Sequence, residues 1–288
     1  MKNGTIEPKY KGPLFMAAAS VCWSLGGVCI FFITQSGWSG MSIIGIRALL
    51  AALVFAVYRK SVKINFTPGN VISGLCLAST TILFVFANQL TTAAAAILLQ
   101  FTSPIFVLII RFIFYKKKPK LSEIIAVSVT IMGMALFFAD ELSAGNTLGN
   151  ILAICSGLSF AGVIMGNKRE DTNPEHSLFF GFIINAVLFT PFAFFDQGIS
   201  AEFLPWALIV VVGLVQVGLA YVFFANGIKR TSALLAVLTT ALEPILNPIW
   251  VALATPQRPG RFALFGGIII VLSIVGYNIW ELQRKNTI

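Results

Sequence analysis

The chain has 288 residues, of which 57% are hydrophobic and 11% charged, and 20 Lys and Arg against 11 Asp and Glu give a net charge of +9. Soluble proteins carry charge on about a quarter of their residues. This shortage of charge excludes an ordinary soluble domain, and the apolar character of the whole chain argues against intrinsic disorder.

Long apolar runs between short polar stretches predict ten membrane-spanning helices, each needing about 20 apolar residues. A membrane β-barrel is excluded, because its strands alternate in polarity, whereas runs such as Ile105–Ile110 are unbroken. The predicted fold class is therefore an all-α integral membrane protein. The spans, numbered in chain order, are Pro13–Thr34, Met41–Tyr58, Gly69–Ala87, Thr92–Phe114, Leu121–Ala139, Leu148–Gly166, Ser177–Phe195, Leu204–Ala225, Ser232–Ala254 and Arg261–Trp280.

The basic residues predict the orientation, because Lys and Arg collect in cytoplasmic connections. With the N-terminus inside, Arg258 and Arg261 fall outside, and both termini are expected in the cytoplasm of a cell that carries the protein in its plasma or inner membrane. The same bias explains the net charge without a nucleic-acid partner. The sixteen residues on the inner side are Lys2, Lys9, Lys11, Arg59, Lys60, Lys63, Lys116, Lys117, Lys118, Lys120, Lys168, Arg169, Lys229, Arg230, Arg284 and Lys285.

The sequence repeats itself at about half its length. Phe86–Leu90 returns as Phe224–Ile228, and the stretch ending Ser103-Pro104-Ile105 returns as one ending Glu243-Pro244-Ile245. Five spans in each unit is an odd number, so the second unit must be inverted relative to the first. We predict two units, residues 1–140 with spans one to five and residues 141–288 with spans six to ten.

Several of these stretches carry a family resemblance. Trp23 in the first span, Phe86–Ala93, Gln100–Phe106 and Leu242–Ile245 resemble the EamA branch of the drug/metabolite transporter superfamily. The resemblance implies ten helices around a cavity lined mainly by spans one, three, four, six, eight and nine, with spans five and ten at the periphery. It also implies transport: relatives of the YddG type export amino acids, including aromatic ones, and others carry sugars or quaternary amines.

One feature departs from the family pattern. Relatives often carry Gly-Glu shortly before the proline that opens the fifth or tenth span. This chain has Lys116-Lys117 and Pro256-Gln257 at those places. A role for an acidic residue at these turns is therefore not expected.

Ionisable residues inside hydrocarbon usually face a cavity or a partner. Glu243 is the acid at mid-depth of its span, and it is a candidate for taking up a proton, for pairing with a cationic substrate, or for bonding backbone groups freed by Pro244. Arg47 is a candidate for holding an anion or for an ion pair with Glu243, and the alternative is an Arg that bonds helix-end carbonyls. Arg111 is expected to be an interfacial anchor.

Three of the prolines within spans are candidates for a functional role, because an interior proline removes a backbone hydrogen bond and kinks a helix. Pro104 and Pro244 are repeat mates, and Pro248 lies one turn further. We interpret them as hinges of cavity-lining helices, with a static kink as the alternative. Polar neighbours suited to the freed carbonyls are Gln100, Thr102, Ser103, Thr239, Thr240 and Asn247.

Aromatic walls with a few polar groups suit a small amphipathic molecule, although such residues also serve helix packing. The small-residue pair Gly26-Gly27 is read as a close-packing surface. The candidate substrate-binding residues are Trp23, Ser24, Phe84, Asn88, Gln100, Ser159, Gln216, Tyr221 and Glu243, with Phe160 as a further aromatic candidate.

No cofactor and no metal are expected. His176 is the single histidine, the four cysteines lie within spans without metal-type spacing, and the chain has no Walker-type loop for ATP. An intramembrane enzyme is disfavoured for the same reason, and a membrane scaffold would not need inverted repeats or mid-membrane prolines.

The predicted function is a secondary transporter that exports small metabolites such as amino acids by alternating access, with a cationic amine or drug-like compound as the alternative substrate. The expected partners are a small-molecule substrate, the lipid bilayer and, if Glu243 couples transport, protons. A monomer is expected.

Overall fold

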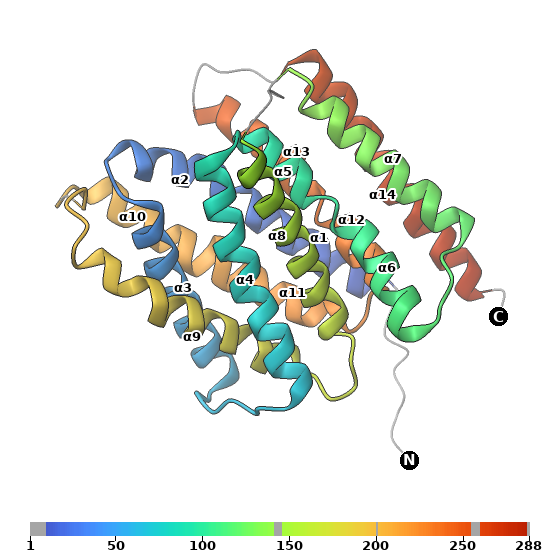
Figure 1. The fold of residues 1–288 in the computed structure, drawn as a ribbon, viewed down its shortest axis with the longest axis horizontal. Coiled ribbons are helices and arrows are strands. Elements are labelled where there is room, and N and C mark those ends of the chain that lie inside the picture. Colours follow the sequence, from blue (N-terminus) through green and yellow to red (C-terminus); the bar gives the residue numbers. More distant parts are fainter. Residues whose placement is uncertain (1–9, 141–145, 200, 255–259, 287–288) are drawn as a thin grey trace.

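The computed structural model describes residues 10–140, 146–199, 201–254 and 260–286, and within these ranges the chain forms helices without a strand (Figure 1). The predicted all-α class is confirmed. The elements are α1 (Lys11–Ser24), α2 (Gly26–Gln35), α3 (Gly40–Arg59), α4 (Pro68–Leu90), α5 (Ala93–Gln100), α6 (Ser103–Tyr115), α7 (Leu121–Phe137), α8 (Thr147–Gly166), α9 (Pro174–Ala193), α10 (Phe203–Val211), the π-helix η1 (Val212–Leu219), α11 (Ala220–Ile228), α12 (Ala233–Thr239), α13 (Leu242–Ala254) and α14 (Arg261–Asn286).

The helices follow the predicted spans. Nine helical stretches of the described chain are long and apolar enough to cross a membrane, and α7 is a shorter apolar helix of 17 residues at the fifth span. Some spans are built from successive segments: α1 and α2 form the first, α5 and α6 the fourth, α10, η1 and α11 the eighth, and α12 and α13 the ninth. The other spans are single helices.

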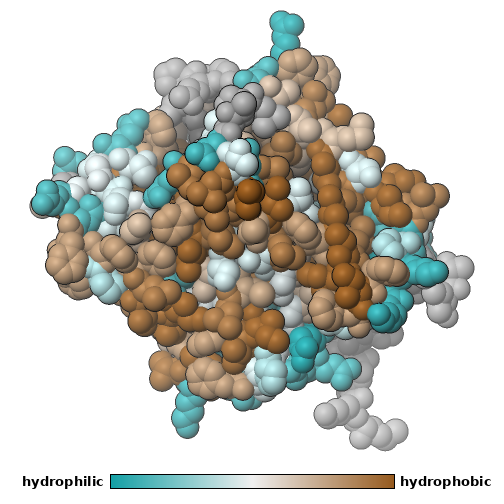
Figure 2. Space-filling view, in the orientation of Figure 1, coloured by the Kyte–Doolittle hydropathy of each residue, from teal (hydrophilic) through white to brown (hydrophobic). Residues whose placement is uncertain are grey.

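Large apolar side chains cover the outside of the bundle. Phe114 is 76% exposed, Met132 70%, Val187 67% and Leu272 65%. Figure 2 shows hydrophobic side chains over much of one face and hydrophilic ones toward its edges. Apolar side chains are favourable in contact with lipid tails, whereas an apolar surface of this kind is unfavourable in water.

Contacts between spans recur when each span is replaced by its equivalent in the other half of the chain. The second span (α3) packs along the seventh (α9), and the fifth (α7) along the tenth (α14), which form a separate pair in Figure 1. The third span (α4) packs on the sixth (α8), and correspondingly the eighth (η1 and α11) packs on the first (α1). This exchange confirms two inverted five-helix repeats.

The basic residues that predicted the orientation are only partly visible. Lys2, Lys9 and Arg258 lie outside the described residues, as do Pro256-Gln257 and the predicted boundary at residue 141. The division into units at residues 140 and 141 and the orientation of the termini therefore stay predictions.

Asp196 fastens the seventh span to the second at one end of the bundle. Its Oδ2 accepts a hydrogen bond of 2.9 Å from the backbone N of Ser39, the residue that caps the start of α3. Burial alone would raise the pKa of the Asp196 carboxyl, but hydrogen bonds from Ser42, Ser39 and Gly198 lower it to about 2. The carboxylate is therefore held in its charged form at the start of α3.

Arg59 and His176 fasten the same two spans at the opposite end. The Nδ1 atom of His176, on α9, accepts from the backbone N of Asn65 at 2.9 Å and lies 3.0 Å from Nη2 of Arg59, at the end of α3. A ring nitrogen that accepts from a backbone N–H carries no proton. Since polar contacts join α3 and α9 at both ends, this pair can serve as a rigid support for the other helices.

We expect Asp196→Asn to lower stability in a pH-dependent manner. The Asp196 pKa is lower in the folded chain than the usual 3.8, so its stabilisation is present above pH of about 4 and is lost as the pH falls toward 2. A shift of this size corresponds to about 2 kcal/mol at most, and partial exposure reduces it to about 1 kcal/mol. Thermal unfolding in detergent, followed by tryptophan fluorescence from pH 7 to pH 2.5, measures this effect.

The control for Asp196→Asn is Glu170→Gln, which removes an exposed acid at the other end of the bundle. The gap in melting temperature between wild type and Asp196→Asn should narrow below pH 4, and the control should show no such gap. A gap that stays constant down to pH 2.5 would contradict the role of the Asp196 charge.

Candidate functional site

A cavity of about 620 Å³ lies in the middle of the bundle, lined by residues of both repeats. It reaches the helix ends at Thr34, Gly40, Gln89 and Ala93, which border the connections between spans one and two and between spans three and four. The cavity therefore opens at this end. Its volume falls in the range of small-molecule sites, which is about 300–1,000 Å³.

Most of the predicted site residues lie on the wall of this cavity. They come from both repeats, and Arg47 and Pro244 lie on the wall with them. The predicted residues on the wall are Trp23, Phe84, Asn88, Gln100, Phe160, Gln216, Tyr221 and Glu243. The structure thus brings them together, and substrate contact at each stays a prediction.

Ser24 and Ser159 do not lie on the cavity wall. The Ser24 hydroxyl accepts a hydrogen bond of 2.8 Å from Nε1 of Trp250 and thereby joins the first and ninth spans. On the sixth span, Ser156, one turn before Ser159, accepts from Nε2 of Gln100 at 2.9 Å and donates to the carbonyl of Thr80 at 2.9 Å. Ser156 does not line the cavity itself, and substrate contact at Ser24 and Ser159 stays a prediction.

The repeat mates Pro104 and Pro244 mark real interruptions of their spans. The fourth span breaks between α5 and α6, and the ninth between α12 and α13, so each proline lies in the first turn of a new helix rather than within a continuous one. A proline costs little there, because the first N–H groups of a helix have no partner within it. Pro104 is buried behind the wall, whereas Pro244 lies on it.

The side chains beside each break bond the carbonyls of the preceding helix. Thr102 Oγ1 donates to the carbonyl of Leu99 at 2.6 Å, and Thr240, whose repeat mate is Gln100, donates to the carbonyl of Val237 at 2.6 Å. Ser20 of the first span donates to the carbonyl of Thr239 at 3.1 Å. At each break a threonine hydroxyl thus bonds a carbonyl of the preceding helix, although the two threonines are not at equivalent positions of the repeat.

Pro248 lies inside α13 and does not line the cavity. Its ring removes a backbone donor one turn after Pro244. A hinge role at Pro104, Pro244 or Pro248 stays a prediction.

Arg47 and Glu243 face the same cavity from opposite repeats, Arg47 on α3 and Glu243 in the first turn of α13. Both side chains are half-buried, and their charges interact electrostatically with each other and with Tyr221. Within the part of the chain that the structure describes, no hydrogen bond or ion pair joins them. The direct Arg47–Glu243 ion pair considered from the sequence is therefore absent here.

Arg111, predicted to be an interfacial anchor, forms an ion pair. Its two Nη atoms form a bidentate ion pair with the carboxylate of Glu123, one at 2.8 Å from Oε1, and Glu123 also accepts from the backbone N of Lys120 at 2.8 Å. Glu123 lies in the first turn of α7, so this pair ties the fifth span to the fourth. The charge serves assembly at a distance from the cavity.

The deep wall of the cavity is aromatic. The Trp23 ring meets the Tyr221 ring edge-on with centroids 5.0 Å apart, and Tyr221 meets Phe182 edge-on at 5.2 Å. Edge-to-face contacts of this kind are favourable in addition to the area that they bury. Rings from the first, seventh and eighth spans therefore close the bottom of the cavity.

Gly26 and Gly27 make room for two amide side chains of the second repeat. A methyl group on Gly26 would lie 2.7 Å from Nε2 of Gln216, and one on Gly27 would overlap the amide of Asn247. Gln216 lies within the π-helix η1 and donates through Nε2 to the carbonyl of Trp23 at 3.3 Å. The glycine pair is thus a close-packing surface, as expected, but one that belongs to the cavity wall.

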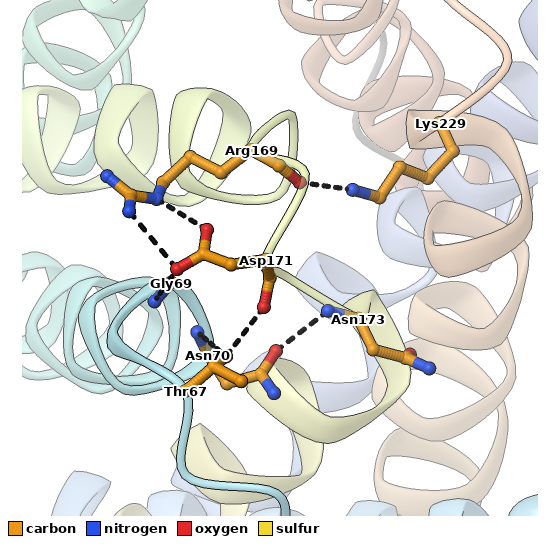
Figure 3. A network of polar contacts seen from close by, with 7 residues as sticks. All are labelled: Thr67, Gly69, Asn70, Arg169, Asp171, Asn173 and Lys229. Carbon is orange, nitrogen blue, oxygen red and sulfur yellow. Dashed lines mark hydrogen bonds and ion pairs between the residues drawn. The ribbon is translucent and has the colours of Figure 1, made fainter.

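The end of the bundle opposite the mouth is held by a polar network (Figure 3). The Asp171 carboxylate, on the connection between α8 and α9, accepts from the backbone N of Gly69 at 3.0 Å and from Nε of Arg169 at 2.8 Å. Thr67 Oγ1 donates to the carbonyl of Asp171 at 2.6 Å, and Lys229 Nζ to that of Arg169 at 2.6 Å. The bond from Arg169 lowers the pKa of Asp171, although burial opposes it. The network joins the third span to the second repeat.

Sequence reasoning missed the contribution of spans two and seven to the cavity. Besides Arg47, the second span contributes Ile43 and Ile44, and the seventh contributes Phe182 and Asn185. The signal for Asn185 was present: it is the single polar side chain in the run from Phe179 to Phe189. The peripheral spans five and ten supply no lining residue among those described.

Two inverted five-helix repeats around a central cavity are an architecture found in many membrane transporters. The sequence pattern of the EamA-like transporter family matches residues 10–139 and again residues 147–279, and the chain belongs to this family. Membership indicates a multi-pass membrane transporter rather than an enzyme.

Individual relatives are distant. The chain is 27% identical to the uncharacterized transporter YwfM of Bacillus subtilis over 81% of either chain, and 21% identical to YxxF of the same organism over 70% of this chain and 66% of that one. It is 22% identical to a biotin transporter of Salmonella typhimurium over 83% of this chain and 84% of that one. A solved crystal structure matches with a TM-score of 0.78 over 95% of this chain and 99% of that chain at 15% identity, which shows the fold alone.

We expect Gly27→Ala to lower transport more than abundance. The added methyl group overlaps the Asn247 amide, and this amide lines an open cavity, so it can swing into the cavity and obstruct it while the fold survives. Flux in proteoliposomes, divided by the amount of folded protein in the same vesicles, should fall about tenfold, which corresponds to about 1.4 kcal/mol.

The matched test adds Asn247→Ala to Gly27→Ala, which removes the obstructing amide and should recover part of the flux. Gly276→Ala is the control, because a methyl group there meets no atom within 4 Å. Loss of abundance equal to the loss of flux in Gly27→Ala would indicate a packing defect alone.

Proposed function

We propose that this chain exports amino acids as a secondary transporter that works by alternating access. The observation that carries the proposal is the arrangement of Arg47 and Glu243: a cation and an anion face one cavity without bonding each other. An amino acid has a carboxylate and an ammonium group on the same carbon, so it can satisfy both charges at once.

The surroundings of the two charges support the same substrate class. Charges inside a membrane protein are costly unless they are paired, and charge-assisted hydrogen bonds are among the strongest that a protein makes. The aromatic wall formed by Trp23, Tyr221 and Phe182 offers an apolar surface for an amino-acid side chain. Polar amides nearby, such as Asn88 and Gln100, can take further hydrogen bonds.

Binding of such a substrate would draw the repeats together, because Arg47 belongs to the first repeat and Glu243 to the second. A ligand shifts a conformational equilibrium only by its difference in affinity for the two states. A zwitterion that reaches both charges gives this difference, since it binds more tightly when the two helices approach. This supplies a reason for closure of the cavity over the substrate.

The packing of equivalent helices supports alternating access. At the closed end, α12 packs on α6 and α11 packs on α9. Their repeat equivalents at the mouth, α5 with α13 and α4 with α3, do not pack closely within the described residues. Since the two repeats have the same design, exchange of their conformations would close the mouth and open the other end.

The direction of transport and the location rest on sequence reasoning. With the predicted cytoplasmic termini, the mouth of the cavity faces outside, and the protein is in an outward-open state in a plasma or inner membrane. Export is the direction implied by the resemblance to transporters of the YddG type. A proton taken up by Glu243 would link export to the proton gradient.

A second candidate substrate is a carboxylate without an ammonium group. The observation in its favour is the similarity to the Salmonella biotin transporter, since biotin has one carboxylate that Arg47 could hold. A cationic amine, which would use Glu243 alone, and a scaffold that moves nothing are the remaining alternatives. The four classes differ in which charged residue they need.

We expect Arg47→Gln and Glu243→Gln each to weaken amino-acid transport by about 10- to 100-fold, because a hydrogen bond to a charged group contributes about 1.5–3 kcal/mol. Counterflow in proteoliposomes with a panel of radiolabelled amino acids, biotin and amines measures the effect. Arg47→Lys keeps the charge without the planar fork and should fall between wild type and Arg47→Gln.

The outcomes separate the substrate classes. Loss with Arg47→Gln alone identifies a carboxylate, loss with Glu243→Gln alone identifies an amine, and loss with both identifies the zwitterion. Unchanged flux with lower abundance in Glu243→Gln would contradict a functional role for this carboxyl, and a panel that never moves would favour the scaffold.

We expect Asp171→Ala to shift the equilibrium toward the state that opens at the other end. The variant removes the bonds to Gly69 and Arg169 that hold that end closed. Exposed polar contacts contribute up to about 1 kcal/mol, so the population ratio should change about two- to fivefold. Hydrogen exchange should become faster in the first turn of α4 and in α12, and slower around Thr34 and Gln89.

Glu170→Ala is the matched control for Asp171→Ala, because it removes the adjacent exposed acid and leaves the bonds of Asp171 in place. Faster exchange throughout the protein in Asp171→Ala would indicate general destabilisation. Such a result would count against a gate at this end.

A further inference from the structure

Asn185 is a buried amide without a partner on the wall of the cavity. It lies on α9 of the seventh span, is 2% exposed, and lines the cavity beside Phe182. Its Oδ1 has no hydrogen-bond partner within the described residues. A polar group that is buried without a partner is unfavourable, so an unpaired amide at this place calls for a functional reason.

The other deeply buried asparagines show what a structural amide looks like in this protein. Asn167 donates through Nδ2 to the carbonyl of Val163 at 2.9 Å and accepts through Oδ1 from Ser177 at 2.7 Å. Asn70 donates to the carbonyl of Asn65 at 2.7 Å and accepts from the backbone N of Asn173 at 2.8 Å. Both amides use both ends, and Asn185 differs from them.

Asn185 lies less than one helical turn, about 4 Å, further from the mouth of the cavity than Arg47. The helices α3 and α9 run antiparallel, and two contacts fix their register: Gly45 abuts the backbone of Phe189 and Thr190, and the Phe55 ring lies 5.4 Å from the Phe182 ring. Because Gly45 is level with Phe189 and Thr190, Arg47 is level with residues 187 and 188, and Asn185 lies two to three residues beyond them, or about 4 Å at a rise of 1.5 Å each. Arg47 and Asn185 therefore lie within one helical turn of each other on packed helices, and both line the cavity.

An amide next to a guanidinium completes a carboxylate-binding corner. Arg47 offers a planar set of N–H donors, and an asparagine amide adds an NH₂ group that can donate to the same carboxylate. The O and N positions of an asparagine are assigned from its hydrogen bonds, so an amide without bonds can turn either atom toward a ligand.

We propose that Asn185 is a specificity-determining residue of this transporter, and that its amide donates a hydrogen bond to the substrate carboxylate that Arg47 holds. The proposal rests on the proposed function in that it requires a substrate with a carboxylate. The proposal adds the seventh span to the substrate-binding elements. This span packs along α3, which carries Arg47. The carboxylate is thereby held by the two helices whose ends are fastened together, which makes this corner a fixed point of the cavity.

The proposal predicts opposite effects of Asn185→Leu on stability and on binding. Leucine has a similar size and no polar group to leave unpaired, so the empty variant should melt at a higher temperature than wild type, by about 1–3 °C. Its affinity for the transported amino acid should fall about 10- to 100-fold. Thermal unfolding in detergent, with and without the amino acid, gives the shift and the dissociation constant.

Two further variants sharpen the test. Asn185→Asp keeps an acceptor, removes the donor and adds a negative charge, so it should bind the carboxylate more weakly than Asn185→Leu does. Asn167→Leu is the matched control at a fully bonded amide, and it should lower the melting temperature. A lower melting temperature of Asn185→Leu with unchanged affinity, or normal binding by Asn185→Asp, would overturn the proposal.

The ligand panel separates this proposal from the proposed function. Wild type is first tested with amino acids, with biotin as a carboxylate without an ammonium group, and with the amines that correspond to the amino acids. If only biotin binds, the amino-acid function fails, and Asn185→Leu must then weaken biotin binding for the carboxylate corner to hold. If amino acids bind and Asn185→Leu binds them equally well, the corner alone fails. Binding of amines and of no carboxylate would overturn both.

Discussion

The structure depends on one constraint: inside hydrocarbon no water is present to bond an exposed backbone group, so each N–H and C=O must find a partner within the protein. The constraint makes the spans helical and limits where a helix can break. The breaks of the fourth and ninth spans lie in the centre of the bundle, beside the cavity, where Thr102, Thr240 and Ser20 bond carbonyls at the break. The irregular backbone of these two spans therefore lies beside the cavity.

Although the two repeats share this design, the two ends of the bundle differ in their packing. The same helical unit occurs twice in opposite directions, yet α6 and α12 meet at one end while α5 and α13 stand apart at the other. The closed end is held by polar bonds around Asp171, which are individually weak and exchange readily with water. Opening of this end must also separate α6 from α12, whose apolar side chains are buried, whereas the pair α3 and α9 has polar bonds at both ends.

The fold could be predicted from the sequence because span length and repeat parity are properties of the chain alone. Which side chains of a span face the cavity could not be predicted in this way. The sixth span is apolar around its whole circumference, since lipid and protein interior both favour apolar residues, and nothing in the pattern distinguishes Ser159 from Ser156. Ser24 was placed on the correct span, but its bond to Trp250 depends on the position of the ninth span. Asn185 lies on the seventh span, which the family resemblance does not place at the cavity, whereas the structure does.

Charged residues at the cavity also differ from those elsewhere in the molecule in how they are paired. Arg111 is paired with Glu123, Asp171 with Arg169, and Asp196 with the start of α3, each at an end of a helix. Arg47 and Glu243 lie deeper, where an unpaired charge is more costly, and the described residues show no bond between them. If stability alone governed these positions, two apolar residues or a direct ion pair would serve better. In the proposed function, these opposite charges are available to a ligand, and a ligand that bridges them contacts both repeats, since Arg47 belongs to the first repeat and Glu243 to the second.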